Sequence, residues 1–111
     1  MGHATAVDNQ AKVAIVRRVL VGMHALGVRR AVIMPDTYHL GERAIDGLGY
    51  AGEGAPELDL LDMSATGEPE DSERAARMMA SQGVRAIVVL GGDGTVRMVA
   101  KGAGEIPLLP I

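Results

Sequence analysis

The chain contains no cysteine, phenylalanine or tryptophan, and it has only two tyrosines. Without cysteine it can have no disulfide framework, no thiolate metal site and no cysteine nucleophile. Stacking of bases on aromatic side chains, which single-stranded nucleic-acid binders use, is nearly impossible with so few rings. The formal net charge of -3 also argues against a general binder of nucleic acid or of membrane surfaces.

Long apolar runs are absent too. None approaches the roughly 18 residues of a transmembrane helix. The N-terminus lacks a basic start followed by an apolar stretch, so we expect no secretory signal and a cytoplasmic protein. The 111 residues, 48% hydrophobic and 23% charged, fit one small folded domain rather than a disordered chain.

Amphipathic segments alternate with short apolar runs along the chain. Apolar residues recur every three or four positions in the expected helices. The expected strands are almost continuously apolar, as in a parallel sheet that is buried on both faces. Helices are predicted over 8–26, 40–48, 69–82 and 95–103, and strands over 31–34, 58–63, 86–90 and 106–111. This alternation predicts an α/β fold with an open parallel sheet of about four strands and helices on both faces.

Two further features concern the organisation of the chain. The glycine-rich stretch 47–54 is predicted to be a mobile loop. Its formal G-x-G-x-x-G at Gly47, Gly49 and Gly52 follows no strand and opens no helix, so we interpret it as a chance match. Because the chain opens on a helix and closes on the apolar run 106–111, we expect it to be part of a longer protein.

The strongest functional signal is the turn Gly91–Thr95 (GGDGT), which follows the clearest predicted strand and leads into a helix. Ligands of open α/β sheets bind at the carboxyl ends of the strands. Glycines let the main chain approach a ligand, and a helix N-terminus adds about half a positive charge. The turn therefore favours a phosphate or pyrophosphate ligand, although no Walker-A sequence is present.

Asp93 at the centre of this turn changes the expected chemistry. A carboxylate beside a phosphate is repulsive unless it meets a hydroxyl group or a Mg²⁺ ion. A site that binds phosphates and also presents a base suggests phosphoryl transfer to an alcohol. The alternative is purely structural: Asp93 would cap a helix that begins at Thr95, and the glycines would only form a tight turn.

The residues 87–95 (IVVLGGDGT) resemble the signature of the NAD kinase family. The diacylglycerol kinases, the sphingosine kinases and the phosphofructokinases share a related glycine–aspartate turn. The wider chain, from about Asp8 to Ile111, is similar to the ATP-NAD kinase-like proteins of acetoin-catabolism clusters. The segments that carry this wider resemblance are 34–36, 66–72, 91–102 and 106–111.

The resemblance implies a partial, Rossmann-like N-terminal α/β nucleotide-binding domain that spans residues 1–111. It also implies ATP-dependent phosphorylation of NAD to NADP with Mg²⁺, in which Asp93 acts on the 2′-hydroxyl of the adenosine ribose or orders the reacting groups. The residues implied to lie against the phosphates are Gly91, Gly92, Gly94 and Thr95. Family parts that complete the site have no counterpart here, so we expect the isolated chain to be inactive.

Two more residues are candidates for nucleotide contacts. Asp36 follows the first predicted strand and Thr66 follows the second, at the same sheet edge as Asp93 if all strands are parallel. The structural alternatives are that Asp36 turns or caps the chain after Pro35 and that Thr66 only begins the next helix. The three histidines show no ligand spacing, so no protein metal site is predicted.

The expected partners are the nucleotides ATP and NAD, with no nucleic acid and no membrane. We also expect a homo-oligomer, because an uncovered strand edge at 106–111 would recruit a second copy. Two other functions remain open: a non-catalytic nucleotide-binding or regulatory domain, and a kinase of a lipid or another alcohol.

Overall fold

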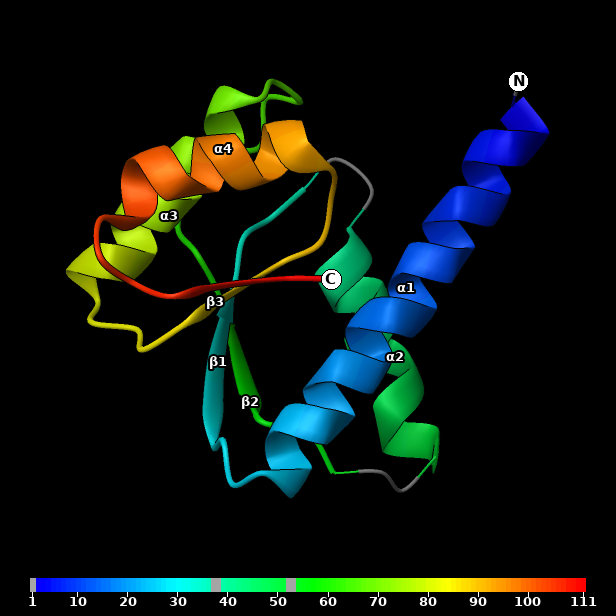
Figure 1. The fold of residues 1–111 in the computed structure, drawn as a ribbon. Helices are drawn as coiled ribbons and strands as arrows, with labels where there is room; N and C mark the ends of the chain where they lie inside the picture. The colour runs from blue at the N-terminus through cyan, green and yellow to red at the C-terminus, as the bar shows by residue number, and fades with distance from the viewer. Residues whose placement is uncertain (1, 37–38, 52–53) are drawn as a thin grey trace. The chain divides into compact units, whose positions relative to one another are not determined.

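The computed structural model describes residues 2–36, 39–51 and 54–111 and divides into two compact units, Met1–Leu60 and Leu61–Ile111. Each unit pairs two helices with two parallel strands (Figure 1). The α/β class and the parallel strand pairing predicted from the sequence are confirmed. A single four-stranded sheet is not shown, since the strands among the described residues form two two-stranded sheets.

The first unit contains α1 (Gly2–Ala25), β1 (Arg30–Ile33), α2 (Leu40–Ala51) and β2 (Glu57–Leu60). β1 pairs with β2 in parallel, from Arg30 opposite Glu57 to Ile33 opposite Leu60. The buried centre of this unit is formed where α1 meets α2. Its buried core residues are Val13, Leu20 and Ala44.

Two boundaries in the first unit differ from the prediction. α1 begins at Gly2, before the predicted caps Asp8 and Asn9, but it stops as predicted at Gly27, whose φ of 92° favours glycine. α2 continues to Ala51, so the predicted loop over 47–54 is wrong for the residues up to Ala51. Packing against α1 outweighs the low helix propensity of the glycines in this helix. Gly52 lies outside the described residues.

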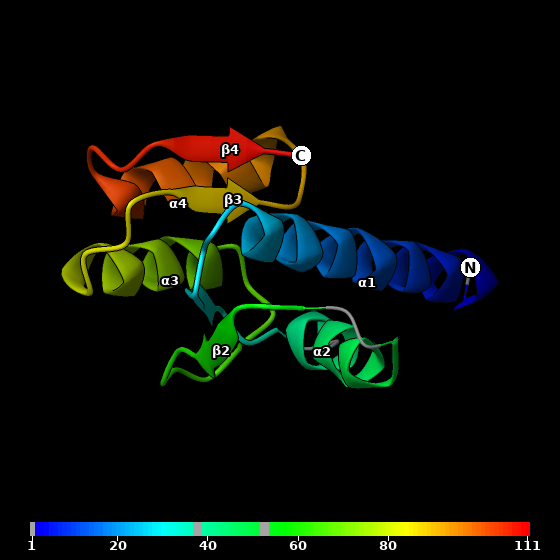
Figure 2. The same cartoon turned by 90° about the horizontal axis from the view of Figure 1, so that it is seen from below.

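The second unit contains α3 (Glu70–Ser81), β3 (Ile87–Val89), α4 (Asp93–Ala103) and β4 (Leu108–Pro110). β3 pairs with β4 in parallel, from Ile87 opposite Leu108 to Val89 opposite Pro110. One core cluster joins both helices to β3: Ala76, Ile87, Val89, Val99 and Ala103. Figure 2 shows that α3 and α4 both begin at the end of this unit toward which β3 and β4 point. The turns that lead into both helices therefore lie at that end of the unit.

No helix among the described residues is long and apolar enough to cross a membrane.

Candidate nucleotide site

The turn between β3 and α4 contains the glycine–aspartate sequence. β3 ends at Val89, and α4 begins at Asp93 with Gly92 as its N-cap in an extended conformation. The helix thus starts earlier than the predicted Thr95. Asp93 does not cap it, because this residue already lies in the first helical turn and is exposed to solvent.

The packing of this turn favours glycine at position 91. A Cβ atom at Gly91 would lie 2.8 Å from Oγ1 and 2.9 Å from Cβ of Thr95, closer than real side chains approach. A Cβ at Gly92 or Gly94 would meet nothing within 4 Å. The space beside these two glycines is open, so a ligand can approach the main chain there.

The first turn of α4 offers main-chain donors to such a ligand. The first N–H groups of an α-helix have no intrahelical acceptor, and the helix dipole places partial positive charge beside them. Phosphates bind at helix N-termini for these reasons. Asp93 lies in the same helical turn and is exposed, so the turn presents anion-binding donors and an exposed carboxylate together.

A second turn at this end of the unit precedes α3 and is organised around Asp71. The hydroxyl of Thr66 donates to Oδ1 of Asp71 at 2.7 Å, and its main-chain N–H donates to Oδ2 at 2.9 Å. The N–H of Gly67 donates to the same Oδ2 at 2.9 Å. The guanidinium of Arg74 donates to Oδ1 at 2.5 Å and, more weakly, to the carbonyl of Ser64 at 3.4 Å. One carboxylate thus holds the whole turn.

Asp71 is buried, with 5% of the residue exposed. Burial alone would raise the pKa of this carboxyl group, because it removes water from the charged form. The hydrogen bonds from Thr66, Arg74 and the two main-chain N–H groups outweigh burial and lower the pKa of Asp71 to about 2 from 3.8. Asp71 is therefore charged at neutral pH. Both of its carboxylate oxygens accept hydrogen bonds from the preceding turn, and Oδ1 also accepts from Arg74.

The sequence places Asp71 at the acidic start of the predicted helix, but its role in holding the preceding turn was not predicted. A signal was present: Pro69 opens the helix and places Asp71 in its first turn, from which a short carboxylate can reach back to preceding N–H groups.

Comparison with known proteins identifies the group to which the chain is related. Residues 52–111, more than half of the chain, match the family described as diacylglycerol kinase catalytic domain. The chain belongs to this kinase family. The matched residues run from just before β2 to the end of the chain, so they include the Gly91–Thr95 turn, the Thr66 turn and Asp71.

A curated relative covers almost the whole chain. Acetoin catabolism protein X from Cupriavidus necator is 39% identical over 116 residues, which is 97% of this chain and 31% of the relative. The chain thus spans about a third of that relative's length. No solved structure matches the chain significantly. The kinase-like family resemblance noted from the sequence is confirmed, and so is the similarity to an acetoin-linked protein.

Asp36 lies outside the residues that match the kinase family. It follows β1 in the first unit, where its Oδ1 accepts from the N–H of Leu40 at 3.1 Å and its carbonyl accepts from the N–H of His39 at 3.2 Å. The side chain thus helps to open α2, as the structural alternative expected. Its contact with a nucleotide stays a prediction.

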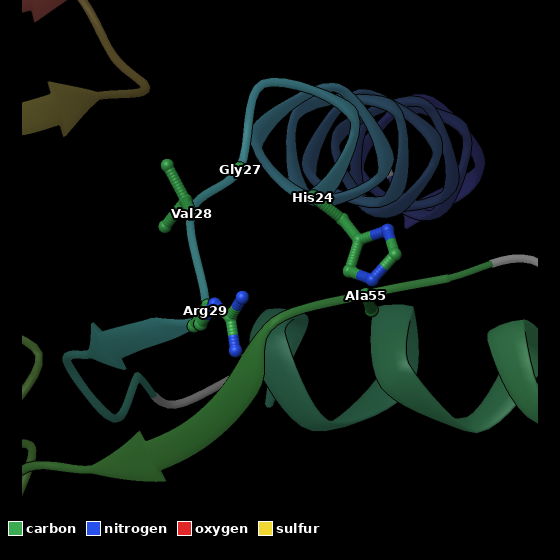
Figure 3. Close-up of a pocket in the computed structure, with 5 residues that line it drawn as sticks. All are labelled: His24, Gly27, Val28, Arg29 and Ala55. Atoms are coloured by element: carbon green, nitrogen blue, oxygen red, sulfur yellow. The ribbon is translucent and has the colours of Figure 1, made fainter.

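The first unit contains a hollow of about 410 Å³, and none of the residues that line it belongs to these turns. Figure 3 shows the ring of His24 lying beside the segment that carries Ala55, with Gly27, Val28 and Arg29 on the connection to β1. These residues precede β1 and β2, so the hollow lies at the amino ends of the strands. Open α/β sheets bind ligands at the opposite, carboxyl ends.

Proposed function

We propose that this chain supplies the nucleotide-binding face of a phosphotransferase that moves the γ-phosphoryl group of ATP to an alcohol. The observation that supports this most is the exposed Asp93 in the first turn of α4, directly after the glycine turn that ends β3. Kinase-family membership supports a phosphotransferase. Gly91, Gly92, Gly94 and Thr95 would lie against the phosphates in this proposal.

Asp93 would act on the hydroxyl group of the acceptor. The acceptor oxygen forms a bond to the γ-phosphorus, while the bond from that phosphorus to the β–γ bridging oxygen breaks and ADP leaves. The proton of the hydroxyl passes to the carboxylate of Asp93 and from there to water. The main-chain N–H groups of the turn would meet the phosphate charge.

Mg²⁺ fits these residues as a partner of the phosphates. Among the described ranges, no three or more His, Asp and Glu side chains gather as a cluster that could hold a metal. Mg²⁺ in kinases is nevertheless bound through one or two carboxylates together with the phosphates of the substrate. Asp93 is the residue that would contact it, and the ion when bound would neutralise phosphate charge.

The acceptor that we propose first is NAD, phosphorylated on the 2′-hydroxyl of its adenosine ribose. Supporting this is the resemblance of residues 87–95 to the NAD kinase signature. We also propose that the four strands form a single sheet. In that sheet, Asp36 and Thr66 would follow strands that end at the same edge as the strand before Asp93.

A lipid or other alcohol is the second candidate acceptor, and the match to a diacylglycerol kinase catalytic domain favours it. The test uses the full-length protein with ATP labelled on the γ-phosphate and supplies NAD, diacylglycerol in mixed micelles, or no acceptor. We expect label in NADP. Label in the lipid alone would replace NAD by the second candidate, and no transfer to either acceptor with intact ATP binding would indicate a regulatory nucleotide-binding domain.

A further inference from the structure

The hollow in the first unit forms where two connections diverge ahead of the paired strands. The N–H of Glu57 donates to the carbonyl of Arg29 at 2.8 Å and joins the two chains at that point. Ahead of this bond, no main-chain hydrogen bond links Gly27–Val28 to Gly54–Ala55 in the described part of the chain. The space of about 410 Å³ between these connections has the size of a small-molecule site.

Two side chains with nitrogen donors border this space, His24 from the end of α1 and Arg29 from the start of β1. Figure 3 shows the imidazole ring and the guanidinium on the same side of the connection, while Val28 points to the other side. Neither His24 nor Arg29 has a side-chain hydrogen bond or ion pair with another described residue. Their donors are therefore open to a ligand.

A glycine at position 54 lets the His24 ring lie against the neighbouring connection. A Cβ atom at this position would lie 2.5 Å from Nδ1 of His24, closer than real side chains approach. The ring is thus held over the hollow between the end of α1 and the segment that leads into β2.

The acidic side chains of β2 lie on the opposite face of the strands. Side chains alternate between the two faces along a strand. Leu58 packs against the core between α1 and α2, so Glu57 and Asp59 lie on the face away from these helices. Arg30 is on that face too, since its guanidinium donates to Asp59 at 2.8 Å. Arg29, one residue earlier, therefore keeps its positive charge on the side of the hollow.

The end of α1 sets the charge of the ligand that suits this place. The carbonyls of residues 22–24 accept hydrogen bonds from the N–H groups of residues 26–28, so they need no ligand donor. The helix dipole still leaves about half a negative charge at this end. One guanidinium therefore suits a ligand with a single negative charge better than a phosphate group, which carries about two.

We propose that the hollow is a binding site for a small carboxylic acid, whose carboxylate is bound by the guanidinium of Arg29 and by a ring N–H of His24. A guanidinium presents paired N–H donors in the geometry of a carboxylate, and a neutral imidazole provides one further N–H. The site shares no residue with the Gly91–Thr95 turn. The acid is thus a second ligand, additional to the nucleotide of the proposed function.

The test follows the signals of the isotope-labelled chain by NMR during addition of butyrate, butyramide or inorganic phosphate at constant ionic strength. Butyramide has the shape of butyrate without its charge. Butyrate should give saturable shifts of the main-chain amides of Val28, Arg29 and Ala55 and of the carbon-bound ring protons of His24. Butyramide should leave these signals in place, and phosphate should bind more weakly than butyrate.

Two variants assign the donors. Arg29→Gln should weaken butyrate binding at least about tenfold, because it removes a charge-assisted pair of hydrogen bonds. Arg30→Gln is the matched control: it removes the same charge from the next residue, whose side chain is bonded to Asp59 on the other face, and should leave the affinity within about twofold. His24→Leu keeps the charge of Arg29 and should weaken binding by a smaller factor. Both site residues are exposed, so these variants should stay folded.

Several results would overturn the proposal. One is the absence of saturable shifts with butyrate, and another is an equal response to butyramide or to phosphate. Equal weakening in Arg29→Gln and Arg30→Gln would show only general attraction of anions to positive charge. An unchanged affinity in Arg29→Gln or in His24→Leu would also reject the assignment. The proposed function stands apart from all of these results, because none of them concerns the amides of 91–95.

Discussion

Replacing Asp71 by Asn should destabilise the chain, with a loss that depends on pH. The folded-state pKa of Asp71 is lowered from 3.8 to about 2. At about 1.4 kcal/mol per pKa unit, this shift corresponds to about 2 kcal/mol of stability at neutral pH. In Asn, an amide NH₂ group would also replace one of the two acceptor oxygens that now face donors, so we expect a total loss of about 2–3 kcal/mol at pH 7.

The sign of the pH dependence follows from the lowered pKa. The stability that charged Asp71 contributes is fully present above the unfolded pKa near 4 and is lost as pH falls through about 2. About half of it should already be gone at pH 3. The loss caused by Asp71→Asn should shrink correspondingly between pH 5 and pH 2.5.

Urea denaturation followed by far-ultraviolet circular dichroism measures this loss across that range. Glu70→Gln is the control, with an expected change within about 0.5 kcal/mol because its side chain is exposed. An Asp71→Asn loss that is the same at pH 5 and pH 2.5 would refute the assigned role of the charge. A loss no larger than that of Glu70→Gln would refute the carboxylate's role in holding the turn.

Three further substitutions test other parts of the structure. Gly102→Ala brings a Cβ atom against the main chain of α3 and should cost about 1–3 kcal/mol, measured by thermal denaturation. Gly91→Ala forces the Thr95 side chain to move, so binding of ATP, measured by calorimetry, should weaken more than stability falls. Arg30→Gln breaks the exposed pair with Asp59 at 2.8 Å and should change the free energy of unfolding by less than about 1 kcal/mol in urea.

Much of the order of helices and strands could be predicted from the sequence, because the glycines that end helices and the spacing of apolar residues are local features. Gly27 and Gly83 follow the ends of α1 and α3, as predicted, and both have the positive φ that favours glycine. The strand before Gly91 was predicted from its apolar run and is confirmed, although it is shorter than expected.

The remaining features depend on contacts distant in sequence or on side-chain direction. Helix α2 extends through Gly47 and Gly49 because it packs against α1, which no local pattern reveals. Asp71 is buried because a loop folds back over the first turn of α3. The residue types around Asp71, taken alone, are typical of an ordinary acidic helix start. The sequence indicated the Gly91–Thr95 turn, but it did not indicate that the donors of the Thr66 turn are bonded to Asp71.

In the proposed function, Asp93 acts on the acceptor hydroxyl. The most direct test compares turnover and ATP binding of the full-length protein carrying Asp93→Asn with those of Glu105→Gln, which removes an exposed charge elsewhere in the second unit. Asp93→Asn should abolish phosphoryl transfer while ATP affinity is kept or increased, and Glu105→Gln should change neither. Undiminished transfer by Asp93→Asn would contradict this role.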